Sequence, residues 1–191
     1  FGSQTLNPEQ IISYEAEYQG WWMKHRLRTR LDLFFNHLSD LINFQTVGTA
    51  RTLVNGGEAD IYGTEAGLEF LATRWLSGFA NMSYQKIGQT FTGVSRRGGP
   101  DWKANVGLRG DWDNGLNGEL AVHYVASATY PLIEFFSALA PVLPSPTSPT
   151  VDSYTLLNLR GGYRFWHDKA EVAMAVYNAL NDKHKEHPLG D

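Results

Sequence analysis

Side chains that could bind a metal or catalyse a reaction are few and scattered in this sequence. His184 and His187 enclose Lys185 and Glu186 at a spacing that metal ligands use, but the segment is highly charged and we interpret it as a solvated loop. His123 and Ser127 share one strand face four residues apart, too far for the hydrogen bond between a nucleophile and its base. We therefore expect no catalytic residue, no metal site and no cofactor, and the sequence does not predict an enzyme.

The composition excludes several classes of protein. The chain has 191 residues, 42% of them hydrophobic and 19% charged, and its 16 basic residues face 20 acidic ones. This balance is too apolar for a disordered chain and too close to neutral for a protein that binds nucleic acid. Cysteine is absent, and no apolar run reaches the roughly 18–20 residues of a membrane-spanning helix. Six tryptophans and 19 glycines favour β structure and leave membrane β-barrels open.

Apolar and polar residues alternate with a period of two over most of the chain. The pattern is strictest after residue 101, where Trp102, Val106 and Leu108 oppose Lys103 and Arg109. Residues 26–42 also carry an apolar stripe with helical spacing, but the neighbouring segments favour a strand there. We expect antiparallel strands at 10–22, 25–40, 59–73, 75–88, 101–113, 117–130, 153–166 and 169–180.

The connections alternate between short and long, which is typical of an up-and-down meander with two unequal ends. Short turns are expected near 21–25, 73–75, 113–116 and 166–169, and long loops at 40–58, 88–100, 131–152 and after 181. Beside the short turns lie five of the six tryptophans: Trp21, Trp22, Trp75, Trp112 and Trp166. Indole rings gather where hydrocarbon meets water, so this pattern indicates an aromatic girdle at one rim of a barrel. Tryptophans that close the core ends of a soluble sandwich are the alternative.

The face opposite the apolar one carries most of the charges. Its members are Glu15, Glu17, Arg26, Arg28, Arg30, Asp32, Glu65, Glu69, Lys103, Arg109, Asp111, Glu119, Arg160 and Arg164. In a soluble sandwich these residues would face the solvent, and in a membrane barrel they would line the interior. Alternation alone does not distinguish the two arrangements. The girdle and the unequal loops favour the barrel.

Three groups of short motifs occur in order along the chain. Leu6-Asn7-Pro8-Glu9 precedes Ile12-Ser13-Tyr14-Glu15. Asp40-Leu41-Ile42 precedes Asn55-Gly56-Gly57-Glu58-Ala59 and Tyr62-Gly63-Thr64-Glu65. Residues 154–163 precede Val176-Tyr177-Asn178-Ala179-Leu180-Asn181-Asp182-Lys183. In order and spacing these segments resemble the L-x-P-E, D-L-I, N-x-G-x-A and N-L-x-D-K stretches of TonB-dependent outer-membrane receptors.

The resemblance implies an all-β fold, an antiparallel up-and-down meander of about eight strands from a 22-stranded transmembrane β-barrel. Residues 1–191 would form the C-terminal portion of that barrel, in the outer membrane of a Gram-negative bacterium and surrounded by its lipid. The family's plug domain, through which TonB would act, and its last strand are not among the matched segments.

The function implied by the resemblance is TonB-energised uptake of a scarce nutrient, with a ferric siderophore as the first expectation. The ligand would then be a small-molecule metal chelate bound near the external loops. Tyr130, Phe135 and Phe136 are expected to stack on it, and Arg96 and Arg97 to bind its anionic groups. Two alternatives stay open: a small passive outer-membrane barrel or pore, and a soluble β-sandwich binding module.

Two structural expectations follow. The strands at 10–22 and 169–180 should not pair with each other, because an eight-stranded barrel is too narrow for the charges on its polar face. The proline-rich segment 131–152 should be an irregular external loop, with Leu132–Leu139 as the one stretch free enough of proline for a short helix.

Overall fold

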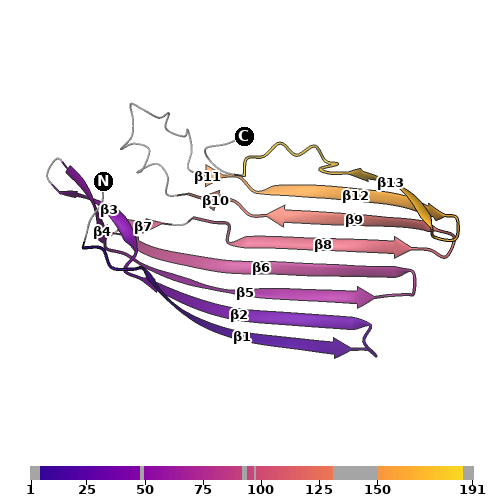
Figure 1. The fold of residues 1–191 in the computed structure, drawn as a ribbon, viewed down its shortest axis with the longest axis horizontal. Coiled ribbons are helices and arrows are strands. Elements are labelled where there is room, and N and C mark those ends of the chain that lie inside the picture. Colours follow the sequence, from indigo (N-terminus) through magenta and orange to yellow (C-terminus); the bar gives the residue numbers. More distant parts are fainter. Residues whose placement is uncertain (1–4, 48–49, 92–93, 97, 131–149, 187–191) are drawn as a thin grey trace.

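A single antiparallel sheet of eight long strands dominates the fold. The computed structural model describes residues 5–47, 50–91, 94–96, 98–130 and 150–186. The long strands are neighbours in chain order (Figure 1): β1 Gln10–Trp22, β2 Leu27–Ser39, β5 Glu58–Leu71, β6 Leu76–Phe91, β8 Trp102–Asp111, β9 Leu116–Val125, β12 Tyr154–Phe165 and β13 Ala170–Val176. All eight expected strands are confirmed, including a strand rather than a helix at Leu27–Ser39. The described residues contain no helix that could cross a membrane.

Short strands occupy segments where the sequence predicts only loops. β3 Ile42–Val47 and β4 Ala50–Asn55 form a hairpin, so the expectation of an unbroken loop at 40–58 is wrong. β6 continues to Phe91 and β7 Val94–Arg96 folds back on it, which corrects the loop expected at 88–100. β10 Ala128–Thr129 lies within the strand expected at 117–130, which is interrupted after Val125, and pairs with β11 Thr150–Val151 at the end of the expected irregular segment 131–152. The rest of that segment, 131–149, lies outside the described residues.

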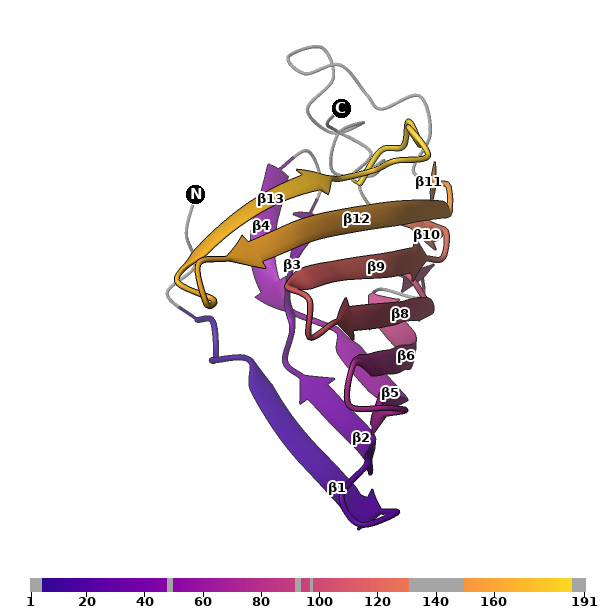
Figure 2. The same cartoon turned by 90° about the vertical axis from the view of Figure 1, so that its right-hand side faces the viewer.

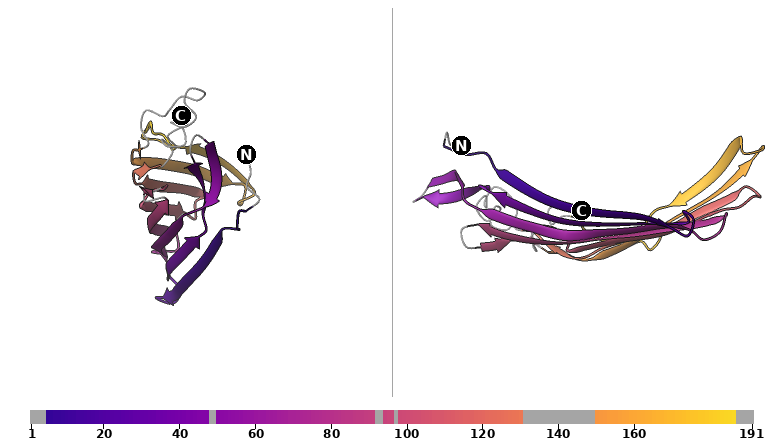
Figure 3. Two further views of the ribbon diagram at one scale, coloured as in Figure 1. Left: turned by 90° about the vertical axis from the view of Figure 1, so that its left-hand side faces the viewer. Right: turned by 90° about the horizontal axis from the view of Figure 1, so that it is seen from below.

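The sheet is one layer thick, curved and open. Seen along the strands it bends into an arc with β1 and β13 at its two ends (Figures 2 and 3). Within the described residues each of these edge strands has a neighbour on one side only, so the expected absence of pairing between them is confirmed. The few buried apolar side chains do not make up a core between two layers: Leu41, Ala59, Ala121, Ala128 and Val151. The alternative of a soluble β-sandwich is therefore wrong.

Strand register places side chains of similar polarity opposite one another on each face of the sheet. Leu31, Ala66, Met82, Ala104 and Tyr124 lie opposite one another across five neighbouring strands and form an apolar row. The adjacent row on the other face is polar and contains Arg30, Gly67, Asn81, Asn105 and His123. Because side chains alternate between the faces of a strand, this register keeps the two surfaces chemically distinct across the sheet.

The polar face is the concave one. A hollow of about 880 Å³ extends over β2, β5, β6 and β8, and it is lined by side chains of that face such as Arg28, Glu69 and Arg109. The convex face leaves large apolar side chains uncovered, with Met174 73% exposed and Val172 68% exposed. A chain in water rarely leaves such a continuous apolar surface open, so this face requires an apolar surrounding.

Four of the five tryptophans near the short turns fit the predicted girdle. Trp75 and Trp112 stack with ring centroids 5.6 Å apart, and the indole nitrogen of Trp22 donates to the Thr29 hydroxyl at 3.0 Å. Trp166, in the turn after β12, is 76% exposed. Trp21 differs, because its ring lies on the concave face with the Arg28 guanidinium carbon 5.9 Å from its centroid. The alternation within β1 explains this, since Trp21 and Trp22 must point to opposite faces.

Arginine substitutions at two adjacent residues of β6 test the orientation of the sheet. Met82 lies on the convex face and Ser83 on the concave face, where Glu65 is its cross-strand partner. In the full-length protein, Met82→Arg should destabilise the fold by about 2–4 kcal/mol, because it places a charge in the apolar surrounding that the convex face requires. Ser83→Arg should be tolerated. The heat-modifiable gel mobility of the folded barrel measures both, and equal tolerance would contradict the assignment of the faces.

Candidate functional site

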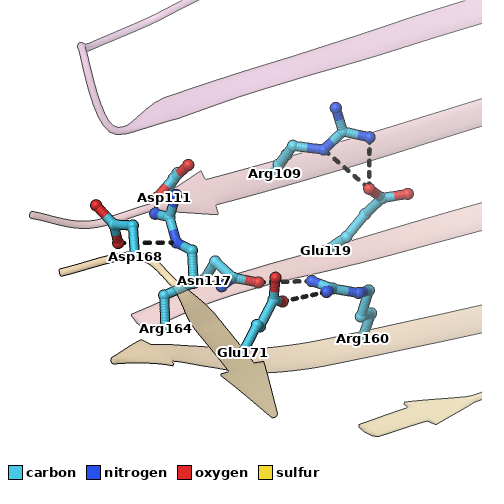
Figure 4. Close-up of polar contacts among 8 residues, drawn as sticks. All are labelled: Arg109, Asp111, Asn117, Glu119, Arg160, Arg164, Asp168 and Glu171. Carbon is cyan, nitrogen blue, oxygen red and sulfur yellow. Dashed lines mark hydrogen bonds and ion pairs between the residues drawn. The ribbon is translucent and has the colours of Figure 1, made fainter. Parts of the chain in front are cut away.

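Cross-strand ion pairs line the concave face near the short turns. Arg109 on β8 and Glu119 on β9 are register partners, and the guanidinium donates from Nε and Nη2 to Glu119 Oε2 at 2.9 and 2.6 Å (Figure 4). Arg160 on β12 donates to Asn117 Oδ1 at 2.5 Å and pairs with Glu171 on β13. Arg164 pairs with Asp111 and approaches Asp168. These contacts join the last four long strands through side chains as well as through the backbone ladder.

A second group of charges lies on the first three long strands. Arg30 Nε is 2.8 Å from Asp32 Oδ2 and 3.5 Å from Glu17 Oε1. Arg28 Nη1 is 3.4 Å from Glu69 Oε1 on the neighbouring strand. All of these side chains keep access to water, so the concave face is hydrated rather than packed. Such pairs fix the register of the wall and contribute little stability individually.

Where the strands approach the long loops, the concave face ends in a cavity of about 250 Å³. Part of its wall is formed by three residues that lie opposite one another on neighbouring strands: Lys103 on β8, Val125 on β9 and Tyr154 on β12. The lining is completed by Pro100, Ala126, Ala128, Tyr130, Val151 and Glu186. The lining therefore includes two tyrosines, one lysine and one glutamate. This arrangement can stack on a ring and pair with its anionic substituents.

His184 packs beside this cavity. Its ring stacks on Tyr154, with centroids 3.8 Å apart and an angle of 12° between the planes. Its nitrogens lie 3.5 Å from Asp182 and 3.7 Å from Glu186, and its side chain is 15% exposed. The interpretation of 184–187 as a solvated loop is therefore wrong for His184, whose position depends on the chain folding back after β13. The described residues hold no group of three or more ligating side chains that could bind a metal.

Asn178 holds the segment that carries His184. Its side-chain oxygen accepts from the Asp182 backbone N–H at 2.9 Å, and its Nδ2 donates to the Asp182 carbonyl at 2.9 Å. The Asp182 carboxylate in turn accepts from the Thr155 N–H at 3.2 Å. The motif at 178–183 thus ends the pairing of β13 and fastens the following chain against β12.

Of the five predicted ligand contacts, one can be placed in full. Tyr130 lines the cavity, and its contact with a ligand stays a prediction. Arg96 ends β7, and its side chain lies outside the described part of the structure. Arg97, Phe135 and Phe136 also lie outside the described residues. Sequence reasoning missed Lys103 and Tyr154 as cavity residues, although their positions at the loop ends of expected strands were a usable signal.

Exchange of the charges in the Arg109–Glu119 pair tests its role in the wall. Arg109→Glu alone places two carboxylates opposite each other and should lower stability by up to about 1 kcal/mol, while Arg109→Glu with Glu119→Arg should restore it. The measurement is the urea midpoint of the full-length barrel at low and high salt. The effect should shrink at high salt because the pair is exposed. Additive effects of the two substitutions would contradict a direct pair.

Comparisons with known proteins agree with this architecture. Solved structures with the same fold include the FrpB iron transporter from Neisseria meningitidis, at 17% identity and a TM-score of 0.71 over 97% of this chain. The ferripyoverdine receptor of the outer membrane of Pseudomonas aeruginosa, bound to ferripyoverdine, matches at 16% identity and 0.71 over 94%. The copper transporter OprC matches at 16% identity and 0.69 over 97%. The chain spans 29%, 24% and 27% of these three proteins, respectively.

A family comparison identifies the chain more directly than these distant structural matches. The family model described as TonB dependent receptor-like, beta-barrel matches residues 1–179. Members of this family are transporters rather than enzymes. With its meander of strands, its uncovered convex face and its hydrated concave face, the chain belongs to the β-barrel family of the TonB-dependent receptors.

Proposed function

We propose that residues 1–191 form part of the barrel wall of an outer-membrane receptor that imports a scarce nutrient with energy delivered by TonB. The barrel would lie in the outer membrane of a Gram-negative bacterium, with lipid against its convex face. TonB would act through a plug domain beyond this chain. A metal chelate, and first of all a ferric siderophore, is the proposed ligand.

The loop-end cavity is the observation that carries the proposal. Tyr130 and Tyr154 offer ring faces, Lys103 offers a cation, and the cavity opens at the end of the barrel that the long loops surround. Stacking on a planar ligand group and neutralising its charge are the two tasks of a chelate receptor that this set supports. Arg96, Arg97, Phe135 and Phe136 remain proposed contacts from the adjoining loops.

The structural neighbours support the class of cargo. One is described as an iron transporter, one as a receptor bound to ferripyoverdine and one as a copper transporter. Metal uptake is thus shared by proteins of this fold whose sequences differ widely from this chain. The cavity suits one planar, charged group of a chelate, because its described lining provides rings and charges.

Transport of radioactive iron tests the function. The full-length receptor is expressed in cells that lack siderophore receptors, with and without TonB, and supplied with a panel of ⁵⁵Fe-loaded siderophores. We expect saturable uptake of at least one siderophore that disappears without TonB. Tyr154→Leu should weaken apparent affinity roughly five- to tenfold through the loss of stacking.

Tyr163→Leu is the matched control, because Tyr163 lies on the convex face near the short turns and is 52% exposed. It should leave the apparent affinity unchanged. Heat-modifiable mobility verifies that both variants are folded. Uptake that continues without TonB would favour the passive pore, and no uptake of any metal chelate would refute the proposed ligand class.

A further inference from the structure

The β3–β4 hairpin is a bent continuation of the β2–β5 hairpin. Leu38 faces Ala59 before the bend, and Ile42 faces Asn55 after it, so each strand advances by four residues and the register is unbroken. Between these two pairs, residues 39–41 and 56–58 are not ladder partners of each other. Even there, Leu41 N–H donates to the Gly57 carbonyl at 3.1 Å and Gly56 N–H to the Leu41 carbonyl at 3.0 Å. The hairpin is therefore rotated out of the sheet without being detached from it.

The bend directs the hairpin over the concave side. Figures 2 and 3 show β3 and β4 standing inside the arc of the sheet rather than continuing its wall. Figure 1 places the hairpin at the same end of the strands as β10 and β11, which border the loop-end cavity. The direction of the hairpin thus sets how much of this end of the barrel is covered.

Two backbone hydrogen bonds cross the bend, but its residues leave room for further restraint by side chains. Gly56 and Gly57 allow a wide range of dihedral angles, and two such residues in series would act as a hinge. Asp40 has a positive φ of 56°, a conformation that needs support from its surroundings. Side chains add to the restraint that these backbone bonds give.

The Asn55 side chain joins its own strand to two other chain segments. Its Oδ1 accepts from the Asn7 N–H at 2.8 Å, and its Nδ2 donates to the Asn7 carbonyl at 2.9 Å and to the Asp40 carbonyl at 2.7 Å. Glu9 adds a fourth bond, because its Oε1 accepts from the Ile42 N–H at 2.8 Å. Leu41 is buried beneath these contacts. We name Asn7, Glu9, Asp40 and Asn55 the rim clasp.

Pro8 explains why side chains replace backbone pairing here. If β1 continued in register beyond Gln10, Asn7 would face Ile42 and the ladder would extend onto β3. Pro8 has no N–H to offer to such a ladder. The Glu9 carboxylate instead accepts the hydrogen bond from the Ile42 N–H. The Asn55 side-chain amide bonds both the N–H and the carbonyl of Asn7, as the backbone of a neighbouring strand would.

We propose that the rim clasp holds the β3–β4 hairpin as a fixed wall over the mouth of the barrel, and that Asn55 is a positioning residue for ligand capture. The motifs at 6–9, 40–42 and 55–59 are then one device assembled from three separate parts of the sequence. The fixed wall follows from the contacts above, whereas the link to ligand capture rests on the proposed function.

Distance measurements by double electron–electron resonance test the fixed wall. Spin labels are attached to the full-length receptor, freed of other cysteines, at Thr52→Cys on the hairpin and Ser127→Cys beyond β9. We expect one narrow distance distribution. Asn55→Asp should broaden it, because this isosteric change removes both donated bonds and sets a carboxylate against two carbonyls.

Two further comparisons separate the clasp from general damage. Glu9→Ala should broaden the distribution, whereas Glu9→Gln keeps an acceptor for Ile42 and should not. Asn36→Asp is the matched asparagine control, since the Asn36 side chain makes no hydrogen bond to another described residue. Unchanged distributions in both Asn55→Asp and Glu9→Ala would overturn the proposal. Heat-modifiable mobility confirms that each barrel is folded.

Binding of the siderophore identified by uptake tests the positioning role. Asn55→Asp should weaken it roughly three- to tenfold, through loss of a preorganised wall, while Asn36→Asp should not. A broadened hairpin with unchanged affinity would overturn the role of Asn55 in ligand capture. If no chelate is taken up at all, the proposed function fails, and the spin-label distances still decide whether the clasp fixes the hairpin.

Discussion

Backbone hydrogen bonding across a single layer is the constraint on which this structure depends. In hydrocarbon no water replaces a missing partner, so every N–H and C=O of a spanning strand must pair with a neighbouring strand. The unbroken order from β1 to β13 meets that demand everywhere except at the two edges. A sheet without a second layer also has no core, and its convex apolar side chains find their apolar surrounding outside the protein. An apolar surrounding thus takes the place that a hydrophobic core has in a soluble domain.

The charged face follows from the same constraint. Since the convex face must be apolar, the polar residues of each strand meet on the concave face, where cross-strand register brings Arg109 to Glu119 and Arg30 near Glu17. Water screens these pairs, so they fix register and keep the interior hydrated more than they stabilise the sheet. The proposed ligand-binding groups lie at the loop end, where the strands finish and Tyr154 and Lys103 border a cavity.

Much of the fold could be predicted from the sequence because the two faces of each strand meet different solvents. That difference imposes a period of two, which located the other long strands, whereas the strand at Leu27–Ser39 was predicted from its neighbours because its own pattern also fits a helix. The β3–β4 hairpin was missed because Gly56 and Gly57 resemble a loop, while the bonds that order it come from Asn7 and Glu9, more than thirty residues away. His184 was misjudged for a related reason, since its contact with Tyr154 depends on the chain turning back at Asn178.

The central claim is that the two faces of the sheet meet lipid and water, and β8 offers the most direct test. Single spin labels are placed at each residue from Lys103 to Asp111 of the full-length receptor in lipid vesicles. Collision rates are then measured with oxygen, which concentrates in hydrocarbon, and with a water-soluble nickel complex. The account predicts rates that alternate with a period of two, with oxygen favoured at Ala104, Val106 and Leu108 and nickel at Lys103, Asn105 and Arg109. Uniform rates along the strand, or alternation of the opposite sign, would contradict it.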